Sequence, residues 1–167
     1  MPDGPVFRHA VQMLPFVRAL DDTRLVMLNS GRFDGRTGQP SGGSMMGISL
    51  WQDQAGALEP NVTYNGTKAP INALGVLWEP GRLSLHPGPA GEFCVLRWTA
   101  PADGTYALSA KFLSIAEKAT TDVHVLHRGK PLFDSRLNLE GHGMQAPYAA
   151  ELSVKAGDKI DFVVGWG

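Results

Sequence analysis

The sequence predicts an all-β domain built as an antiparallel β-sandwich, and three observations lead to that prediction. Glycine and proline are abundant, with 20 and 12 residues in a chain of 167, whereas together they make up about 12% of an average protein. Charged residues are scarce, at 19% against about 25%. Short apolar runs are separated by turn residues, and no long run has a helical period. Short strands joined by tight turns are typical of a sandwich.

The N-terminal part predicts little regular structure. Residues 1–22 are expected to form either an N-terminal arm or an additional strand or short helix, because Pro15 argues against one continuous helix. Residues 23–29 are apolar enough for a strand, and residues 48–51 predict a second short one. The sandwich domain is therefore expected to span residues 23–167.

Three segments of the first half are expected to be loops. Residues 31–47 are rich in glycine, residues 52–75 lack a period and include the Asn65-Gly66 turn signal, and residues 79–91 contain repeated prolines and glycines. Long loops in a compact domain are frequently functional. We expect recognition to reside in these three loops.

The second half predicts a regular series of strands. In residues 105–113, Tyr106, Leu108, Ala110 and Phe112 alternate with other residues, which indicates a strand with one apolar face. Turn residues follow each predicted strand, as in the hairpin at residues 127–130. The expected strands are residues 92–99, 105–113, 122–127, 149–154 and 159–164, together with a strand that starts with residues 131–134.

Charge and cysteine content exclude several classes. A net charge of −1 offers no electrostatic attraction for nucleic acid. No apolar run reaches about 18 residues, so no membrane span is expected. The first residues lack the clean apolar core of a signal peptide. The one cysteine, Cys94, cannot form an internal disulfide and is expected to be buried, as is Trp98 on the same strand face.

Several short motifs occur in order between residues 75 and 167. They are Leu85-His-Pro-Gly88, Arg97-Trp-Thr-Ala-Pro101, Gly104-Thr-Tyr106, Thr120-Thr-Asp-Val-His-Val-Leu-His127 with Gly129, Leu132-Phe133, Ala156-Gly-Asp158, Ile160-Asp-Phe162 and Val164-Gly-Trp-Gly167. Together they resemble a galactose-binding-like jelly-roll module of secreted bacterial proteins, frequent in Planctomycetes. The resemblance implies a carbohydrate-binding or adhesive accessory domain that is extracellular, periplasmic or on the cell surface.

In the modules that this sequence resembles, one more strand follows the motif that corresponds to residues 164–167. The sequence leaves three alternatives for its place: a continuation of the chain, the N-terminal arm, or a strand from a neighbouring molecule that pairs with an open edge.

A carbohydrate site needs flat rings that stack on the sugar and polar groups that bind its hydroxyls. Loop aromatics with polar neighbours provide the candidates, although each ring could instead fill the core. They are Trp51, Tyr64, Asn65, Trp78, Glu79 and His86.

Metal and catalytic sites have weaker support. His124 and His127 are three residues apart and so face opposite sides of a strand, which argues against a chelating pair. A structural calcium ion is the better candidate for a metal, because hard cations prefer loop carboxylates, although turn formation is the alternative role for these residues. Its candidate ligands are Asp103, Asp122, Asp158 and Asp161. No nucleophile elbow or phosphate-binding motif is present, so we expect no cofactor and no catalytic residue.

Three functional hypotheses follow. The first is a non-catalytic accessory module of an exported bacterial protein that binds a glycan or cell-surface polysaccharide. The second is a structural or adhesion domain completed by strand exchange with other copies or domains of the parent protein. The third is a glycan-active enzyme on the same sandwich fold.

Overall fold

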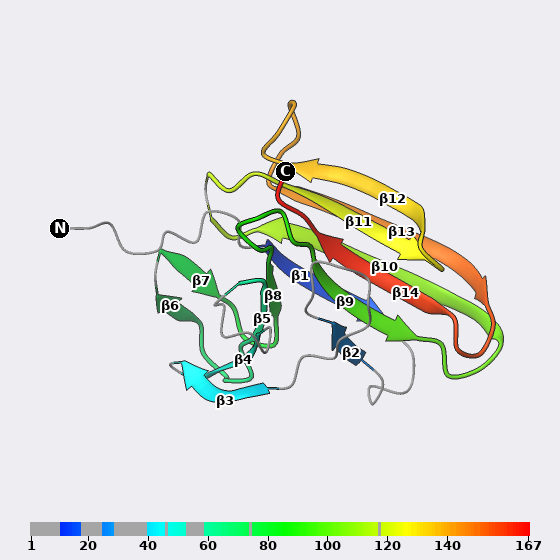
Figure 1. The fold of residues 1–167 in the computed structure, drawn as a ribbon, viewed down its shortest axis with the longest axis horizontal. Coiled ribbons are helices and arrows are strands. Elements are labelled where there is room, and N and C mark those ends of the chain that lie inside the picture. The colour runs from blue at the N-terminus through cyan, green and yellow to red at the C-terminus, as the bar shows by residue number, and fades with distance from the viewer. Residues whose placement is uncertain are drawn as a thin grey trace.

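The computed structural model describes residues 11–17, 25–28, 40–45, 47–52, 59–73, 75–116 and 118–167, and these form strands, turns and loops without a helix (Figure 1). The predicted all-β class is therefore confirmed. The strands are β1 (Val11–Val17), β2 (Leu25–Leu28), β3 (Pro40–Met45), β4 (Ile48–Gln52), β5 (Asn61–Tyr64), β6 (Ile71–Ala73), β7 (Val76–Trp78), β8 (Leu83–His86), β9 (Cys94–Thr99), β10 (Gly104–Ser114), β11 (Thr121–His127), β12 (Lys130–Leu137), β13 (Gln145–Val154) and β14 (Lys159–Val164).

These strands pair antiparallel in three sheets. The seven-stranded sheet has the order β13-β10-β1-β8-β5-β4-β3, and the five-stranded sheet has the order β12-β11-β14-β9-β2. Strands β6 and β7 form a separate two-stranded sheet. The pairing of β10 with β13 is the longest, and it runs without a shift from Gly104 opposite Val154 to Leu113 opposite Gln145.

One hydrophobic core joins the two larger sheets in a sandwich-like arrangement. On β10 the inward side chains are Leu108, Ala110 and Phe112, all nearly or fully buried, as the period-two pattern predicts. They contact a set from the five-stranded sheet that includes Leu96, Val125 and Phe162. Burial of these apolar side chains from both sheets provides the main stabilisation of the fold.

Aromatic rings connect the two sheets across this core. Phe112 of β10 stacks against Phe133 of β12, with ring centroids 6.4 Å apart, and Phe133 contacts Tyr148 of β13 at 5.0 Å. Near the other end, Trp98 of β9 meets Tyr106 of β10 edge-on at 5.1 Å. The two sheets are thus joined on both sides of the core centre.

The strands predicted for the second half are all present. The last of them, residues 159–164, has the predicted bounds, whereas β13 is longer than predicted. The predicted β11–β12 turn contains Arg128 and Gly129 with φ values of 52° and 75°, which is the backbone geometry of a tight hairpin. Strand β13 begins before Pro147, which is tolerated because β13 lies at a sheet edge.

The loops predicted for the first half are partly wrong. Residues 40–45 form β3, which pairs with β4 through an irregular register. Strands β5 and β6 lie within the predicted loop 52–75, and buried β8 lies within the predicted loop 79–91. These strands have three to six residues, too few to show a clear period, so partners distant in sequence decide their structure. Residues 31–39 and 53–58 lie outside the described residues.

The segment expected as an arm contains β1, which lies between β10 and β8. Pro15 is opposite Ala110 of β10, whereas pairing with β8 includes only Val11 to Met13. Proline lacks an N–H and is tolerated in a sheet where one side of the strand is unpaired. The rest of the predicted arm, residues 1–10 and 18–22, lies outside the described residues.

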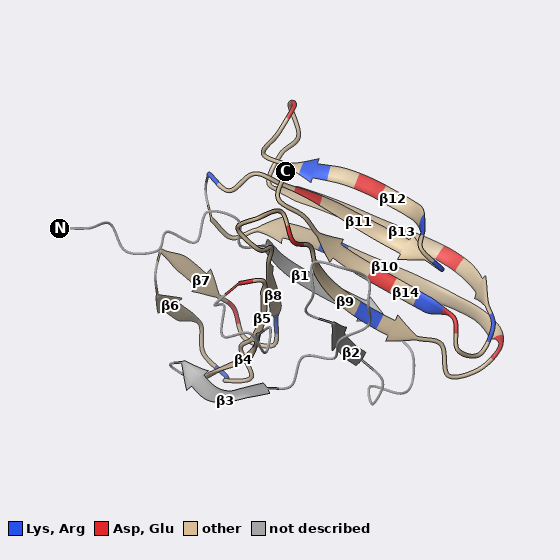
Figure 2. Cartoon of the chain, in the orientation of Figure 1, with Lys and Arg blue, Asp and Glu red and all other residues tan. Residues whose placement is uncertain are grey.

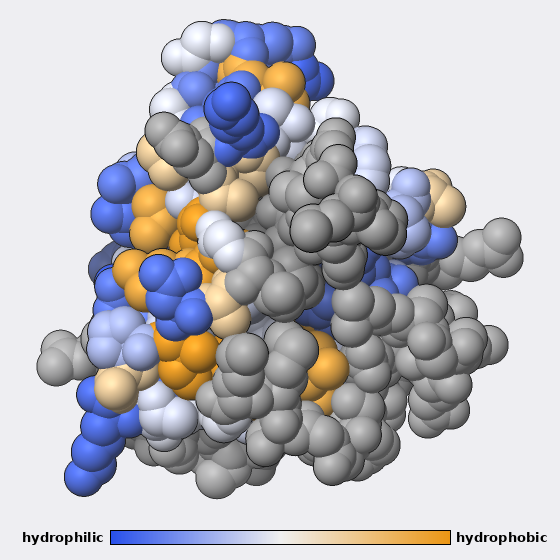
Figure 3. Space-filling model, turned by 90° about the vertical axis from the view of Figure 1, so that its left-hand side faces the viewer, coloured by the Kyte–Doolittle hydropathy of each residue, from blue (hydrophilic) through white to orange (hydrophobic). Residues whose placement is uncertain are grey.

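The described surface is mixed in character. Figure 3 views the molecule from the side on which β6 and β7 lie in Figure 1, and hydrophobic groups there alternate with hydrophilic ones. Leu77 of β7 is 42% exposed. Within the described ranges, no helix is long and apolar enough to cross a membrane.

Candidate functional site

Trp78, one of the predicted stacking rings, is buried in a small second core. Its side chain is 2% exposed and packs with Ile48 and Val76. Its Nε1–H donates a hydrogen bond to Thr63 Oγ1 at 3.1 Å. The ring therefore has no face open to a ligand in this structure, and its contacts explain it as part of the fold.

Asn65 is fully buried and organises the turn that follows β5. Its Nδ2 donates to the carbonyl oxygens of Ala69 and Trp78 at 3.0 and 2.8 Å. Its Oδ1 accepts hydrogen bonds from the Thr67 N–H and hydroxyl at 3.0 and 2.7 Å. These four bonds use the whole amide, so Asn65 holds the turn against β7.

The remaining predicted residues are also placed within or beside the sheets. Trp51 and Tyr64 are partly buried and pack against the main core. His86 is 4% exposed, with Nδ1 2.7 Å from the Pro87 carbonyl oxygen and Nε2 3.6 Å from Glu59 Oε1. Glu79 is half-buried beside β7. None of the six predicted residues lines either of the two pockets described below.

A pocket of about 490 Å³ lies at the end of the sandwich where β11 begins and the chain leaves β14. Its wall combines rings with charged groups from segments far apart in sequence. Among the lining residues are Phe93, Asp134, Arg136, Glu140, His142 and Trp166. Trp166 is 39% exposed, so an aromatic surface borders a cavity that is lined by both apolar and charged side chains.

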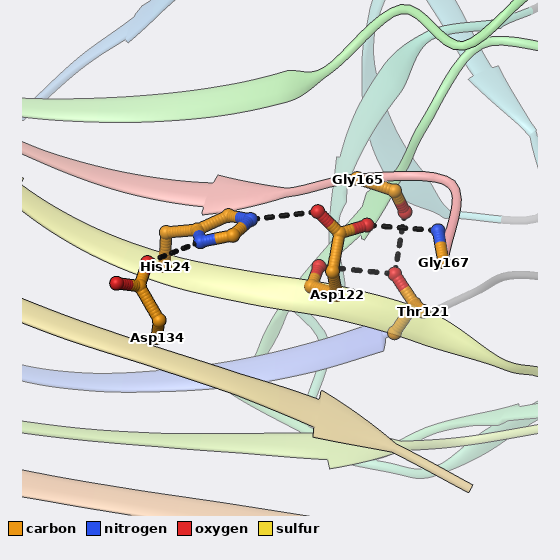
Figure 4. A network of polar contacts seen from close by, with 6 residues as sticks. All are labelled: Thr121, Asp122, His124, Asp134, Gly165 and Gly167. Carbon is orange, nitrogen blue, oxygen red and sulfur yellow. Dashed lines mark hydrogen bonds and ion pairs between the residues drawn. The ribbon is translucent and has the colours of Figure 1, made fainter. Parts of the chain in front are cut away.

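One wall of this pocket is a histidine held by two carboxylates (Figure 4). His124 Nδ1 lies 2.6 Å from Asp134 Oδ1, and His124 Nε2 lies 2.6 Å from Asp122 Oδ2. Asp122 and His124 share a face of β11 because they are two residues apart, and Asp134 is opposite His124 on β12. The ring of Phe93 meets His124 edge-on at 6.2 Å.

These contacts favour the charged imidazolium. The hydrogen bond to Asp122 is the main cause that raises the pKa of His124, with a further contribution from Asp134, while burial opposes the shift. The same bond from His124 lowers the pKa of Asp122. Both ring N–H groups then donate to carboxylates, which leaves no ring nitrogen to accept a proton from a substrate.

A surface ion pair completes the pocket rim. Arg136 Nη1 binds Glu140 Oε1, and both side chains are well exposed. Asp134 Oδ1 and Glu140 Oε1 are the carboxylate oxygens that take part in these contacts. The rim therefore offers hydrogen-bond acceptors beside the Trp166 ring, together with the remaining guanidinium donors.

The four candidate calcium ligands do not meet in one site. Asp103 binds Lys155 Nζ at 2.9 Å and the Ala156 N–H at 2.8 Å, and Asp161 lies within β14, not at a strand end, where it binds Arg97. Asp122 and Asp158 contact protein donors as well. Among the described residues, no group of three or more histidine, cysteine or acidic side chains is arranged to hold a metal ion.

A second pocket, of about 430 Å³, lies at the opposite end of β11, near Arg128 and Lys155. At this end of the sheet, Asp158 binds donors from three other residues. Its carboxylate accepts hydrogen bonds from Arg128 Nε at 2.8 Å, the Lys155 N–H at 2.9 Å and His127 Nε2 at 3.1 Å. The Arg128 bond is the largest cause that lowers the pKa of Asp158 well below its usual range.

We expect the pH dependence of stability to change in the variant Asp158→Asn. A lowered folded-state pKa contributes stability above the unfolded value of about 3.9, and that contribution is lost as the pH falls. Urea midpoints measured between pH 7 and pH 2 should therefore decline less steeply in the variant, which starts from a lower midpoint at pH 7. Glu151→Gln, an exposed position on β13, should keep the wild-type slope. Equal slopes for Asp158→Asn and wild type would contradict the assignment.

Charges are interspersed over the five-stranded sheet and do not form a patch of one sign. Figure 2 shows basic and acidic residues alternating along β12 and β14, with an acidic residue at the start of β11. Among the described residues of this sheet, charges of opposite sign are therefore interspersed.

Sequence reasoning named Asp122 only as a candidate calcium ligand and placed no other residue of the Trp166 pocket in a site. The spacing that mattered was Asp122 to His124, two residues apart on one strand face, and not His124 to His127. His124 is half-buried between two carboxylates. Asp134 and Trp166 carry no local signal, since only pairing of β12 and β14 with β11 brings them together.

Comparisons with protein-family models, with curated proteins and with solved structures found no match for this chain.

Proposed function

We propose that the domain binds carbohydrate in the pocket beside Trp166. The observation that carries the proposal is the 39% exposure of this ring at the edge of a cavity lined by both apolar and charged side chains. Sugars present apolar C–H faces and a rim of hydroxyl groups, so a site for them combines a flat ring with hydrogen-bond acceptors and donors.

The charged groups of the rim suit hydroxyl recognition. The second oxygens of Asp134 and Glu140 are acceptors for sugar hydroxyls, and the guanidinium of Arg136 is a donor. Hydrogen bonds to charged groups are stronger than those between neutral groups. The His124 network holds Asp134 in place, so this acceptor is ordered before a ligand arrives.

The wider assignment rests on the resemblance of residues 75–167 to galactose-binding-like jelly-roll modules. A jelly roll of the galactose-binding-like type and an accessory role in an exported bacterial protein both follow from that resemblance. A core shared by two antiparallel sheets supports such a fold, although fold alone does not determine function. The residues of the pocket therefore support carbohydrate binding. The resemblance adds that the protein is exported or lies at the cell surface.

Retardation in polysaccharide gels tests the proposal, with galactan, galactomannan and xyloglucan as probes and calcium present. Wild type should be retarded by at least one probe. Trp166→Ala should weaken that binding about 30-fold or more, since truncation of a central tryptophan typically costs at least about 2 kcal/mol. Leu77→Ala removes a side chain of similar exposure outside the pocket and should bind as wild type does. Absence of retardation in every gel, or equal retardation of Trp166→Ala and wild type, would refute carbohydrate binding in this pocket.

Assembly by edge pairing has less support from the structure. The edge strands β12 and β13 contain Pro131 and Pro147, and they carry exposed charges at Asp134 and Glu151. Natural proteins use prolines and charges at sheet edges to prevent pairing with other chains. Light scattering at micromolar concentration should therefore give the mass of a monomer, and a stable dimer would favour the assembly hypothesis.

A further inference from the structure

Trp166 is held by backbone contacts on both sides. Before it, the Gly165 N–H donates to the Asp122 carbonyl oxygen at 2.8 Å, and the Gly165 carbonyl oxygen accepts from Thr121 Oγ1 at 2.5 Å. After it, the Gly167 N–H donates to Asp122 Oδ1 at 2.8 Å. Thr121 and Asp122 at the start of β11 thus bind the residues that flank the ring (Figure 4).

The two glycines permit this close approach. A Cβ added to Gly165 would lie closer than 3 Å to both carboxylate oxygens of Asp122. Gly167 has a φ of +91°, in the region that side chains disfavour, and a Cβ there would lie 3.0 Å from the Thr121 backbone. Any larger residue at position 165 would therefore displace the Asp122 carboxylate.

The Asp122 carboxylate is itself fixed in orientation. Its Oδ2 is bound by His124 Nε2, and the other ring nitrogen of His124 is bound by Asp134. One oxygen of Asp122 therefore faces the ring-bearing segment while the other faces the pocket wall. This chain of contacts joins edge strand β12 to the segment that carries Trp166.

We propose that Asp122 is the positioning residue of the Trp166 site: its carboxylate holds residues 165–167 so that the indole is presented to the pocket before a ligand binds. The expected effect of Asp122 on ligand binding rests on the proposed carbohydrate function. Ordering a flexible side chain on binding typically costs about 0.5–1.5 kcal/mol. Loss of this preorganisation should weaken binding roughly three- to tenfold.

Fluorine NMR of the full chain labelled with 5-fluorotryptophan tests the proposal without any ligand. The four tryptophans give four signals, and Trp166→Phe identifies the signal of Trp166. In Asp122→Ala the Trp166 signal should shift and narrow while the other three stay in place. Asp122→Asn retains an oxygen that accepts from the Gly167 N–H and should restore the wild-type signal. Gly165→Ala should perturb the same signal by displacing the carboxylate.

Asp103→Ala is the matched control, because Asp103 also accepts a hydrogen bond from a backbone N–H, that of Ala156. This variant should leave the Trp166 signal and the binding unchanged. Gel retardation in galactan, galactomannan and xyloglucan then measures the three- to tenfold loss in Asp122→Ala.

Three results would overturn the positioning role. They are an unchanged Trp166 signal in both Asp122→Ala and Gly165→Ala, a shift of all four signals, and an equal response in Asp103→Ala. If the Trp166 signal responds as expected but wild type binds no polysaccharide, the positioning role is supported and the carbohydrate function fails.

Discussion

Asp161→Ala should lower the free energy of unfolding by about 3 to 5 kcal/mol. Asp161 is 3% exposed, and its two oxygens bind Arg97 Nε and Nη2 at 2.5 and 2.7 Å. Loss of the carboxylate leaves the guanidinium, whose side chain is only 12% exposed, without its partner. An uncompensated charge in a buried position is strongly unfavourable, and that cost is larger than the net contribution of the intact pair.

Urea unfolding monitored by circular dichroism measures this loss. A double variant separates the cost of leaving Arg97 unpaired from the net contribution of the intact ion pair. Arg97→Met with Asp161→Leu replaces the pair by apolar side chains beside the buried Val95 and Val163. We expect the double variant to recover most of the stability lost in Asp161→Ala.

The ion-pair account can fail in two ways. A double variant less stable than Asp161→Ala would contradict it. A rise in wild-type stability with added calcium that is absent in Asp161→Ala would indicate a metal ligand in place of a partner for Arg97.

Phe112→Ala should also lower the free energy of unfolding by about 3 to 5 kcal/mol. The ring is fully buried between the two larger sheets and stacks on Phe133 of the opposite sheet. Its removal forfeits the burial of the ring and leaves a cavity that flanking strands fill only partly, because β10 is paired on both sides.

Leu77→Ala, whose side chain is 42% exposed, should change stability by less than about 0.5 kcal/mol in the same urea experiment. If Phe112→Ala lost as little stability as Leu77→Ala, the two sheets would not share the core described above. Neither Phe112 nor Asp161 lines the Trp166 pocket. The folded fraction of both variants should therefore bind polysaccharide as wild type does.

The quality of the sequence prediction followed the length and regularity of the strands. The alternation of Tyr106, Leu108, Ala110 and Phe112 extends over a long strand, and the inward face it predicted is the buried one. By contrast, β8 has only four residues next to prolines and glycines, so its alternation of leucine with polar residues is too short to predict a strand, and the segment was taken as loop. Short segments of this kind become strands because their neighbours supply the backbone partners.

The candidate site was less accessible to sequence reasoning than the fold. Trp78 and Asn65 are residue types that are typical of a binding loop. In the structure both are buried and hydrogen-bonded, so they support the fold. Trp166 offered no pattern, since it stands among glycines after the last strand. Its position follows from contacts with Thr121 and Asp122, more than 40 residues earlier in the chain.

By itself, the sequence determined the all-β class, most strands and hairpin turns of the second half, and the absence of a net charge suited to nucleic acid. These properties depend on local alternation, turn residues and composition, which need no knowledge of distant partners. The tertiary structure alone decided which polar residues meet. Antiparallel pairing of β11 with β12 and β14 places Asp134, His124 and Asp122 in one chain of contacts beside Trp166. Such contacts depend on strand order and register, which no local pattern records.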